Sequence, residues 1–192
     1  MTEKDIYLFY SERVKVLYSE IEARNNTLPI ELLFEIHSAF DHLKRFHVDG
    51  EPEEKCADKA FSHLKRGMLD AFKLKLKYHN ADYEKLIKQK TDLRLIDSGK
   101  FLPQLLEARK NIIQTARTAR IAEGQDKIDT AFEKWYELSM LIDEFETCYF
   151  DPRKIQWARR QGVFHFSTNF IIGLITGVLA SILASIVISK FL

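Results

Sequence analysis

The chain contains little glycine, proline or cysteine, and it has no excess of charge of either sign. Seven Gly and four Pro among 192 residues leave few turn positions, which argues against a fold of many short strands. Cys56 and Cys148 form no paired motif, so neither a disulfide scaffold nor a zinc site is expected, and a reducing compartment fits best. The 29 basic and 28 acidic residues nearly cancel, so the composition does not indicate a nucleic-acid partner, and we expect no DNA binding.

Apolar residues recur at helical spacing along most of the chain, and no segment shows the alternation typical of a strand. Turn-forming residues mark the expected helix ends, and Asn80 is a further position where a helix could break. The expected helices cover 2–25, 29–48, 53–90, a stretch opened by Pro103 and interrupted or capped by Gly124, and a last one from 152 onward. The linker between the third and fourth helices is Ser98–Lys100. These features predict an all-α fold.

The last part of the chain is a long uncharged run. From Phe166 to Ser189, 24 residues carry no charge and are rich in Ile, Leu, Val and Ala. At a rise of ~1.5 Å per residue, this run covers the ~30 Å hydrocarbon core of a bilayer with some tilt. We therefore expect a C-terminal transmembrane helix at 166–190, so that the chain is anchored in a lipid bilayer by a single span.

Flanking charge sets the expected orientation of this span. Only Lys190 follows it, whereas four basic residues precede it: Arg153, Lys154, Arg159 and Arg160. The positive-inside rule therefore places the N-terminal side in the cytoplasm. The first ten residues, MTEKDIYLFY, lack an apolar core, so no signal peptide is expected. The expected organisation is a cytosolic helical domain at 1–150, a basic juxtamembrane helix at 151–165 and the transmembrane helix.

One face of the apolar run consists of small and polar residues. Gly173 and Gly177 form a GxxxG pair, which lets helix backbones approach each other in a membrane. Asn169 is costly in lipid and is expected to face protein or water. The remaining members of the candidate packing or pore-lining face are Thr176, Ala180, Ser181, Ala184 and Ser185. The face indicates a homo-oligomer, in which a ring of such helices could line a pore; the alternative is a monomeric anchor with incidental small residues.

A seven-residue segment is nearly repeated. Ala39–Arg45 reads AFDHLKR and Ala60–Arg66 reads AFSHLKR, so six of seven positions agree. A turn lies between the copies, so they are expected to face each other on an antiparallel helical hairpin. Each His precedes its Arg by three residues and shares its helix face, giving a candidate polar site of His42, Arg45, His63 and Arg66. The alternative is a satisfied hydrogen-bond network or a solvated face. No His pair has metal-binding spacing with a carboxylate, and we expect neither a metal nor a cofactor.

The junction RRQGVFH, residues 159–165, contains Arg160 and His165 separated by four residues. This segment is either the basic flank of a membrane helix or a nuclease motif. In the nuclease reading, the His moves a proton from a ribose 2′-hydroxyl and the Arg holds the scissile phosphate. His165 borders the apolar run, where structured RNA is hard to accommodate, so we expect the pair to be non-catalytic.

The spacing resembles the R-x(4–6)-H signature of HEPN domains, which are all-α and often ribonucleases. An all-α domain with this late motif and a hydrophobic helix is similar to the small HEPN-like membrane accessory protein of type VI-B CRISPR systems. The resemblance implies a divergent, cytosolic HEPN-like bundle that is anchored in the inner membrane and enhances an RNA-guided RNase in defence against phage. It further implies an oligomeric pore that depolarises the cell, with the RNase or its RNA products as partners. A membrane-tethered HEPN ribonuclease and a non-enzymatic tail-anchored adaptor are the alternatives.

Overall fold

The chain is all-α in a computed structural model that describes residues 1–89 and 91–191, the side chains of residues 25, 163–169 and 183–191 excepted. No strand occurs among these residues. The α-helices are α1 (Glu3–Phe9), α2 (Lys15–Asn25), α3 (Ile30–Asp49), α4 (Glu53–Lys88), α5 (Phe101–Gly124), α6 (Ile128–Tyr149) and α7 (Pro152–Phe191). A π-helical segment, η1 (Tyr10–Val14), joins α1 to α2, and a 3₁₀ segment, η2 (Leu93–Gly99), precedes α5.

Local signals explain three of the helix ends. Thr2 caps α1 through a capping box with Asp5, in which each side chain bonds the other residue's backbone N–H. Asn26 ends α2 and Gly50 ends α3, each in the left-handed conformation that satisfies the last carbonyls, with φ of 49° and 72°. The single helix predicted over 2–25 is instead interrupted by η1. The break expected near Asn80 is absent, because its side chain accepts a hydrogen bond from Arg109 instead of competing for the backbone.

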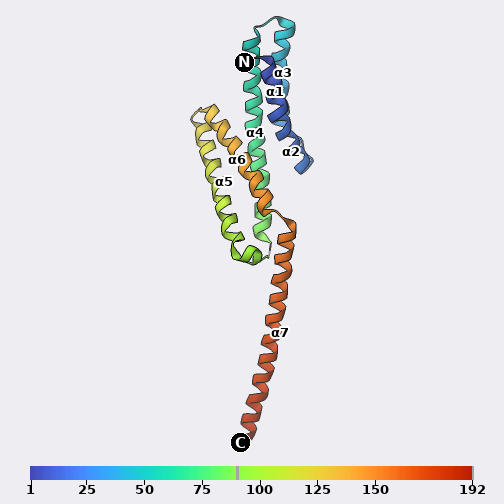
Figure 1. The fold of residues 1–192 in the computed structure, drawn as a ribbon, viewed down its shortest axis with the longest axis vertical. Coiled ribbons are helices and arrows are strands. Elements are labelled where there is room, and N and C mark those ends of the chain that lie inside the picture. Colours follow the sequence, from blue (N-terminus) through green and yellow to red (C-terminus); the bar gives the residue numbers. More distant parts are fainter. Residues whose placement is uncertain (90, 192) are drawn as a thin grey trace. The chain divides into compact units, whose positions relative to one another are not determined.

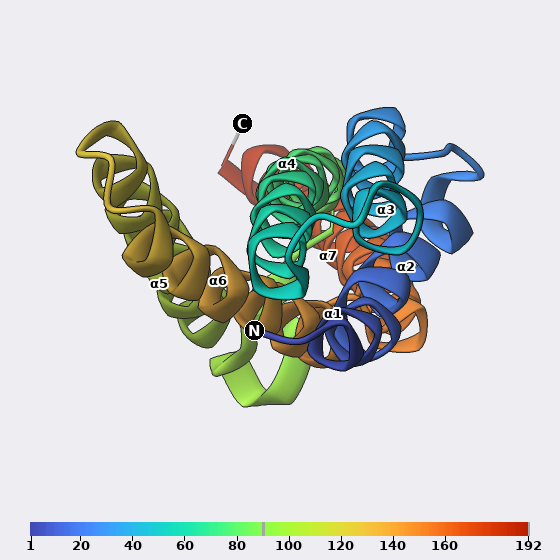
Figure 2. The same cartoon turned by 90° about the horizontal axis from the view of Figure 1, so that it is seen from above.

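The chain divides into two compact units. The first, Met1–Leu86 with Arg109–Glu144, contains an antiparallel pair of helices, α3 and the first part of α4, which run side by side in Figures 1 and 2. Gly67 is the point of closest approach, since a Cβ placed there would lie 2.8 Å from Leu32 Cδ1. Trp135 of α6 is 0% exposed and forms part of the core of this unit. Other fully buried members are Ile6, Ile21, Leu32, Leu64, Met68, Ile112, Leu138 and Ile142.

The second unit consists of Ile87–Ala108 and Phe145–Leu192. The Phe101 and Tyr149 rings meet edge to face at 5.5 Å, and Ala158 at the start of α7 is 0% exposed. Lys154 Nζ donates to Asp97 Oδ2 at 2.9 Å. Asp97 belongs to a turn of three consecutive left-handed residues that ends with Gly99, φ 88°, in the region predicted as a linker. The first turns of α7 are thus packed against η2.

The predicted membrane segment lies within α7. Across the residues that the structure describes, no helix presents an apolar stretch long enough to cross a bilayer. The side chains of 166–169 and 183–190 in that segment lie outside the described residues.

Candidate functional site

The antiparallel hairpin of α3 and α4 brings the two copies of the repeated segment together, as the sequence predicts. The His42 and His63 rings are stacked, with centroids 5.1 Å apart and planes inclined by 28°. Both side chains are half-buried. The close approach at Gly67, one turn from His63, is what allows two helices to place these rings face to face.

Each remaining member of the predicted polar site has a carboxylate partner. Arg45 bonds Asp41 of its own helix, with Nη2 to Oδ2 at 2.8 Å. Across the hairpin, Glu35 accepts from His63 Nδ1 at 2.6 Å, and its other oxygen lies 3.8 Å from Arg66. Arg45, His63 and Arg66 are therefore each paired with a carboxylate, whereas the contact of His42 is the stack with the His63 ring.

The stack limits the chemistry that this pair can perform. A ribonuclease needs an acid and a base on opposite sides of a phosphate, and two stacked rings leave no space between them for one. Burial lowers the pKa of His42, and the positive charges of His63 and Arg45 lower it further. The neutral ring of His42 is therefore favoured in the folded chain.

Two polar partners were missed from the sequence. Glu35 lies two helical turns before His42 on the same face of α3, so its position relative to His63 follows only once the hairpin register is known. Lys75 is 4% exposed at the centre of the first unit. Its ammonium donates to Glu20 of α2 at 2.9 Å, and to Ser139 at 2.9 Å and Asp143 at 2.8 Å of α6.

Lys75 and Ser139 lie within hydrogen-bond distance, as a general base and a serine nucleophile would, but Lys75 cannot act as a base here. All three N–H groups of the ammonium are already donated, two of them to carboxylates, so no lone pair is free to accept the Ser139 proton. Lys75 therefore links α2, α4 and α6 as a structural node. The groups of histidine, cysteine and carboxylate side chains that the structure describes include none able to hold a metal ion.

The described part of the predicted membrane segment, 170–182, exposes its large apolar side chains. Phe170 is 64% exposed and Leu174 is 60% exposed. The others of this segment, each between 51% and 56% exposed, are Ile171, Ile172, Ile175, Val178, Leu179 and Ile182. Soluble chains rarely expose so many consecutive apolar residues, so this part of α7 is a surface that needs a cover of lipid or protein.

The small-residue face of α7 is open within the chain. A Cβ added at Gly173 or at Gly177 would meet no atom within 4 Å. The Thr176 hydroxyl donates to the Ile172 carbonyl of its own helix at 2.8 Å. Ala180 and Ser181 are exposed. The side chains of Asn169, Ala184 and Ser185 lie outside the described residues.

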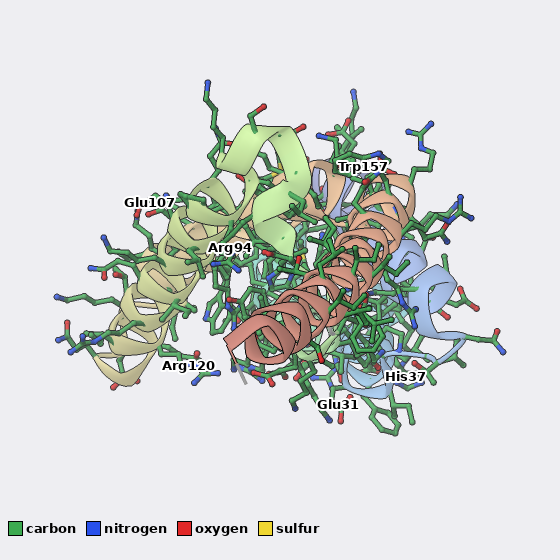
Figure 3. All side chains as sticks on the ribbon, turned by 90° about the horizontal axis from the view of Figure 1, so that it is seen from below. Glu31, His37, Arg94, Glu107, Arg120 and Trp157 are labelled. Atoms are coloured by element: carbon green, nitrogen blue, oxygen red, sulfur yellow. The ribbon has the colours of Figure 1, made fainter. Side chains whose placement is uncertain are left out.

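The predicted Arg160 and His165 pair is described only in part. Arg160 is exposed on α7, and the side chain of His165 lies outside the described residues. Trp157, expected at the membrane interface, is 50% exposed and projects from the first turns of α7 (Figure 3). Comparison with known proteins finds no match among family models, curated proteins or solved structures.

Proposed function

We propose that the chain is a membrane-anchored protein that associates with copies of itself through α7. The observation that supports this proposal most is the run of exposed apolar side chains between Phe170 and Ile182. Lipid is the cover that suits such a run, because at 100° per residue its large side chains span more than half of the helix circumference, opposite the small-residue face.

The free energy of transferring these side chains into a bilayer also favours lipid as the cover. Each Leu, Ile, Phe or Val at the centre of a membrane helix contributes about −0.3 to −0.6 kcal/mol to insertion, so the eight large residues of 170–182 together contribute roughly −2 to −5 kcal/mol. Glycines have little hydrophobic drive, and their value in a membrane is to let a second helix come close. The open positions of Gly173 and Gly177 are therefore suited to contact between copies.

The role that we propose for the assembly is a pore that depolarises the membrane during defence against phage, beside an RNA-guided RNase. This part rests on the resemblance of RRQGVFH and of the all-α architecture to the HEPN-like accessory family. Arg160 and His165 then act at the neck of the anchor, where they shape assembly or the pore mouth instead of cutting RNA.

Leakage of a dye from vesicles tests the proposal. The full chain, reconstituted alone and with its RNase partner, is expected to release the dye, and the double variant Gly173→Ile/Gly177→Ile is expected to release much less. Ile175→Phe adds bulk on the opposite face and serves as the matched control, with leakage near the wild-type level. Absence of leakage from the wild-type chain even with the RNase refutes the pore, and a chain that floats with vesicles but stays monomeric is the tail-anchored adaptor.

A further inference from the structure

A basic groove lies between α4 and α5 in the first unit, and none of the residues of the hairpin network lines it. Its volume is about 410 Å³, and its walls include Asn80 of α4 and three arginines of α5, Arg109, Arg117 and Arg120. Apolar side chains, among them Leu76 and Ile113, form the rest of the lining. A cavity of this size suits a small molecule, since ligand sites commonly occupy ~300–1,000 Å³.

The charge of the groove is not compensated by the protein. Between Ala108 and Ala122 the sequence has four basic residues and no acidic one. Among the described side chains, no carboxylate forms an ion pair with Arg109, Arg117 or Arg120, and the favourable fields at Arg109 come from Tyr83 and Glu84. This differs from most other basic residues of this unit, such as Lys73 and Lys75, which are paired with acids.

Arg109 is held in place without using all of its donors. Its Nη2 donates to Asn80 Oδ1 at 2.7 Å, and its guanidinium lies 4.6 Å from the centre of the Tyr83 ring. Its Nη1 is buried and has no hydrogen-bond partner. A buried donor without a partner is costly, so a ligand acceptor that reaches this donor is favoured.

The repeat Thr-Ala-Arg-Thr-Ala-Arg at 115–120 sets the arrangement of the other two arginines. Ala116 and Ala119 are buried against the core, which leaves each following arginine exposed. Arg117 and Arg120 are three residues apart and therefore neighbours on one face, and Figure 3 shows Arg120 projecting outward from α5. Two guanidinium forks one turn apart are well suited to the oxygens of a phosphate group.

We infer that this groove binds a nucleotide-sized ligand with a terminal phosphate, the phosphate on Arg117 and Arg120 and the base over the apolar wall formed by Leu76 and Ile113. The balanced charge of the chain argues against a long nucleic acid, which needs an extended basic track. A free nucleotide and the phosphorylated end of a short RNA share this chemistry. The inference goes beyond the proposed membrane function and does not depend on it, because all groove residues belong to the first unit.

Calorimetric titration of the full chain in mild detergent tests the inference, with adenosine 5′-monophosphate, adenosine, inorganic phosphate and a 5′-phosphorylated trinucleotide as probes. The monophosphate is expected to bind with a Kd of about 1 mM or tighter, and adenosine at least about tenfold more weakly. The trinucleotide separates the two sources: tighter binding than the mononucleotide assigns the site to RNA ends, and weaker binding assigns it to free nucleotides.

Matched variants locate the binding. Arg117→Gln/Arg120→Gln is expected to weaken binding about 100-fold, and Ile113→Glu is expected to abolish it by placing a carboxylate in the groove. Lys4→Gln/Lys15→Gln removes the same charge from exposed positions on α1 and α2 and is expected to bind as the wild type does. Circular dichroism shows that each variant is folded. Failure of the wild-type chain to bind any phosphate-bearing probe overturns the inference, as does equal binding by the Gln double variant.

Discussion

Gly67 provides the sharpest test of how the α3–α4 hairpin is packed. A Cβ at this position would lie 2.8 Å from Leu32 Cδ1, 2.9 Å from Glu35 Cβ and 3.4 Å from Leu32 Cα. Leu32 is 0% exposed, so its methyl has no free space to move into, and Glu35 Cβ is fixed to the backbone of α3. Any side chain at position 67 therefore has to push the two helices apart.

The size of the effect follows from two opposing contributions. Overpacking costs about 1–3 kcal/mol of the free energy of unfolding, whereas replacing a helical glycine by alanine returns about 1 kcal/mol. Gly67→Ala is therefore expected to lose roughly 0–2 kcal/mol. Gly67→Val adds two methyl groups and has a weaker helix propensity, so we expect it to lose about 2–4 kcal/mol.

Urea unfolding of the full chain in mild detergent measures this loss. In a Trp157→Phe background, fluorescence reports on Trp135, which is 0% exposed in the same unit as Gly67. Gly124→Ala is the control, because an added Cβ there meets nothing within 4 Å, and we expect it to be neutral or slightly stabilising. A Gly67→Val chain as stable as the wild type would show that α3 and α4 are not in close contact.

Two further predictions concern the polar residues of the first unit. The pKa of His42 is lowered from its usual 6.5, so the folded chain binds fewer protons than the unfolded chain below that pH. The stability that is present above pH 6.5 is therefore lost as the pH falls through the pKa of His42 in the folded chain. His42→Gln should flatten the dependence of the urea midpoint on pH between 7 and 5. An unchanged slope in this variant would contradict the prediction. Lys75→Met should lower the free energy of unfolding by about 1–3 kcal/mol, because Glu20 and Asp143 are 45% and 48% exposed and remain hydrated without their partner. Lys75→Ala should lower it clearly more, because the shorter side chain leaves a cavity. Equal urea midpoints for the two variants would contradict this.

Helix positions were predictable because apolar periodicity and turn residues determine them locally. The hairpin of α3 and α4 follows from the repeat and from the turn before Pro52, and the facing of His42 and His63 is confirmed. The π-helical segment η1 was not predictable, because Tyr10–Val14 continues the helical pattern of its neighbours and carries no breaker.

Polar partners across helices were harder to predict than the helices themselves. The pairing of Glu35 with His63 depends on the register between α3 and α4, and the contacts of Lys75 depend on three helices that are far apart in the sequence. Lysine is almost never fully buried, so composition and periodicity place Lys75 at the surface. The arginine groove was missed for the same reason, since Asn80 and Arg109 meet only in the folded unit.

We propose that α7 brings copies of the chain together in a membrane. The most direct measurement is the particle mass of the full chain in mild detergent, by mass photometry or light scattering, for the wild type and for Gly173→Ile/Gly177→Ile. We expect a discrete oligomer for the wild type and a smaller species for the variant, since bulk at either position blocks close approach of helices. A monomeric wild-type chain at every concentration, or an oligomer of equal mass in the variant, would contradict it.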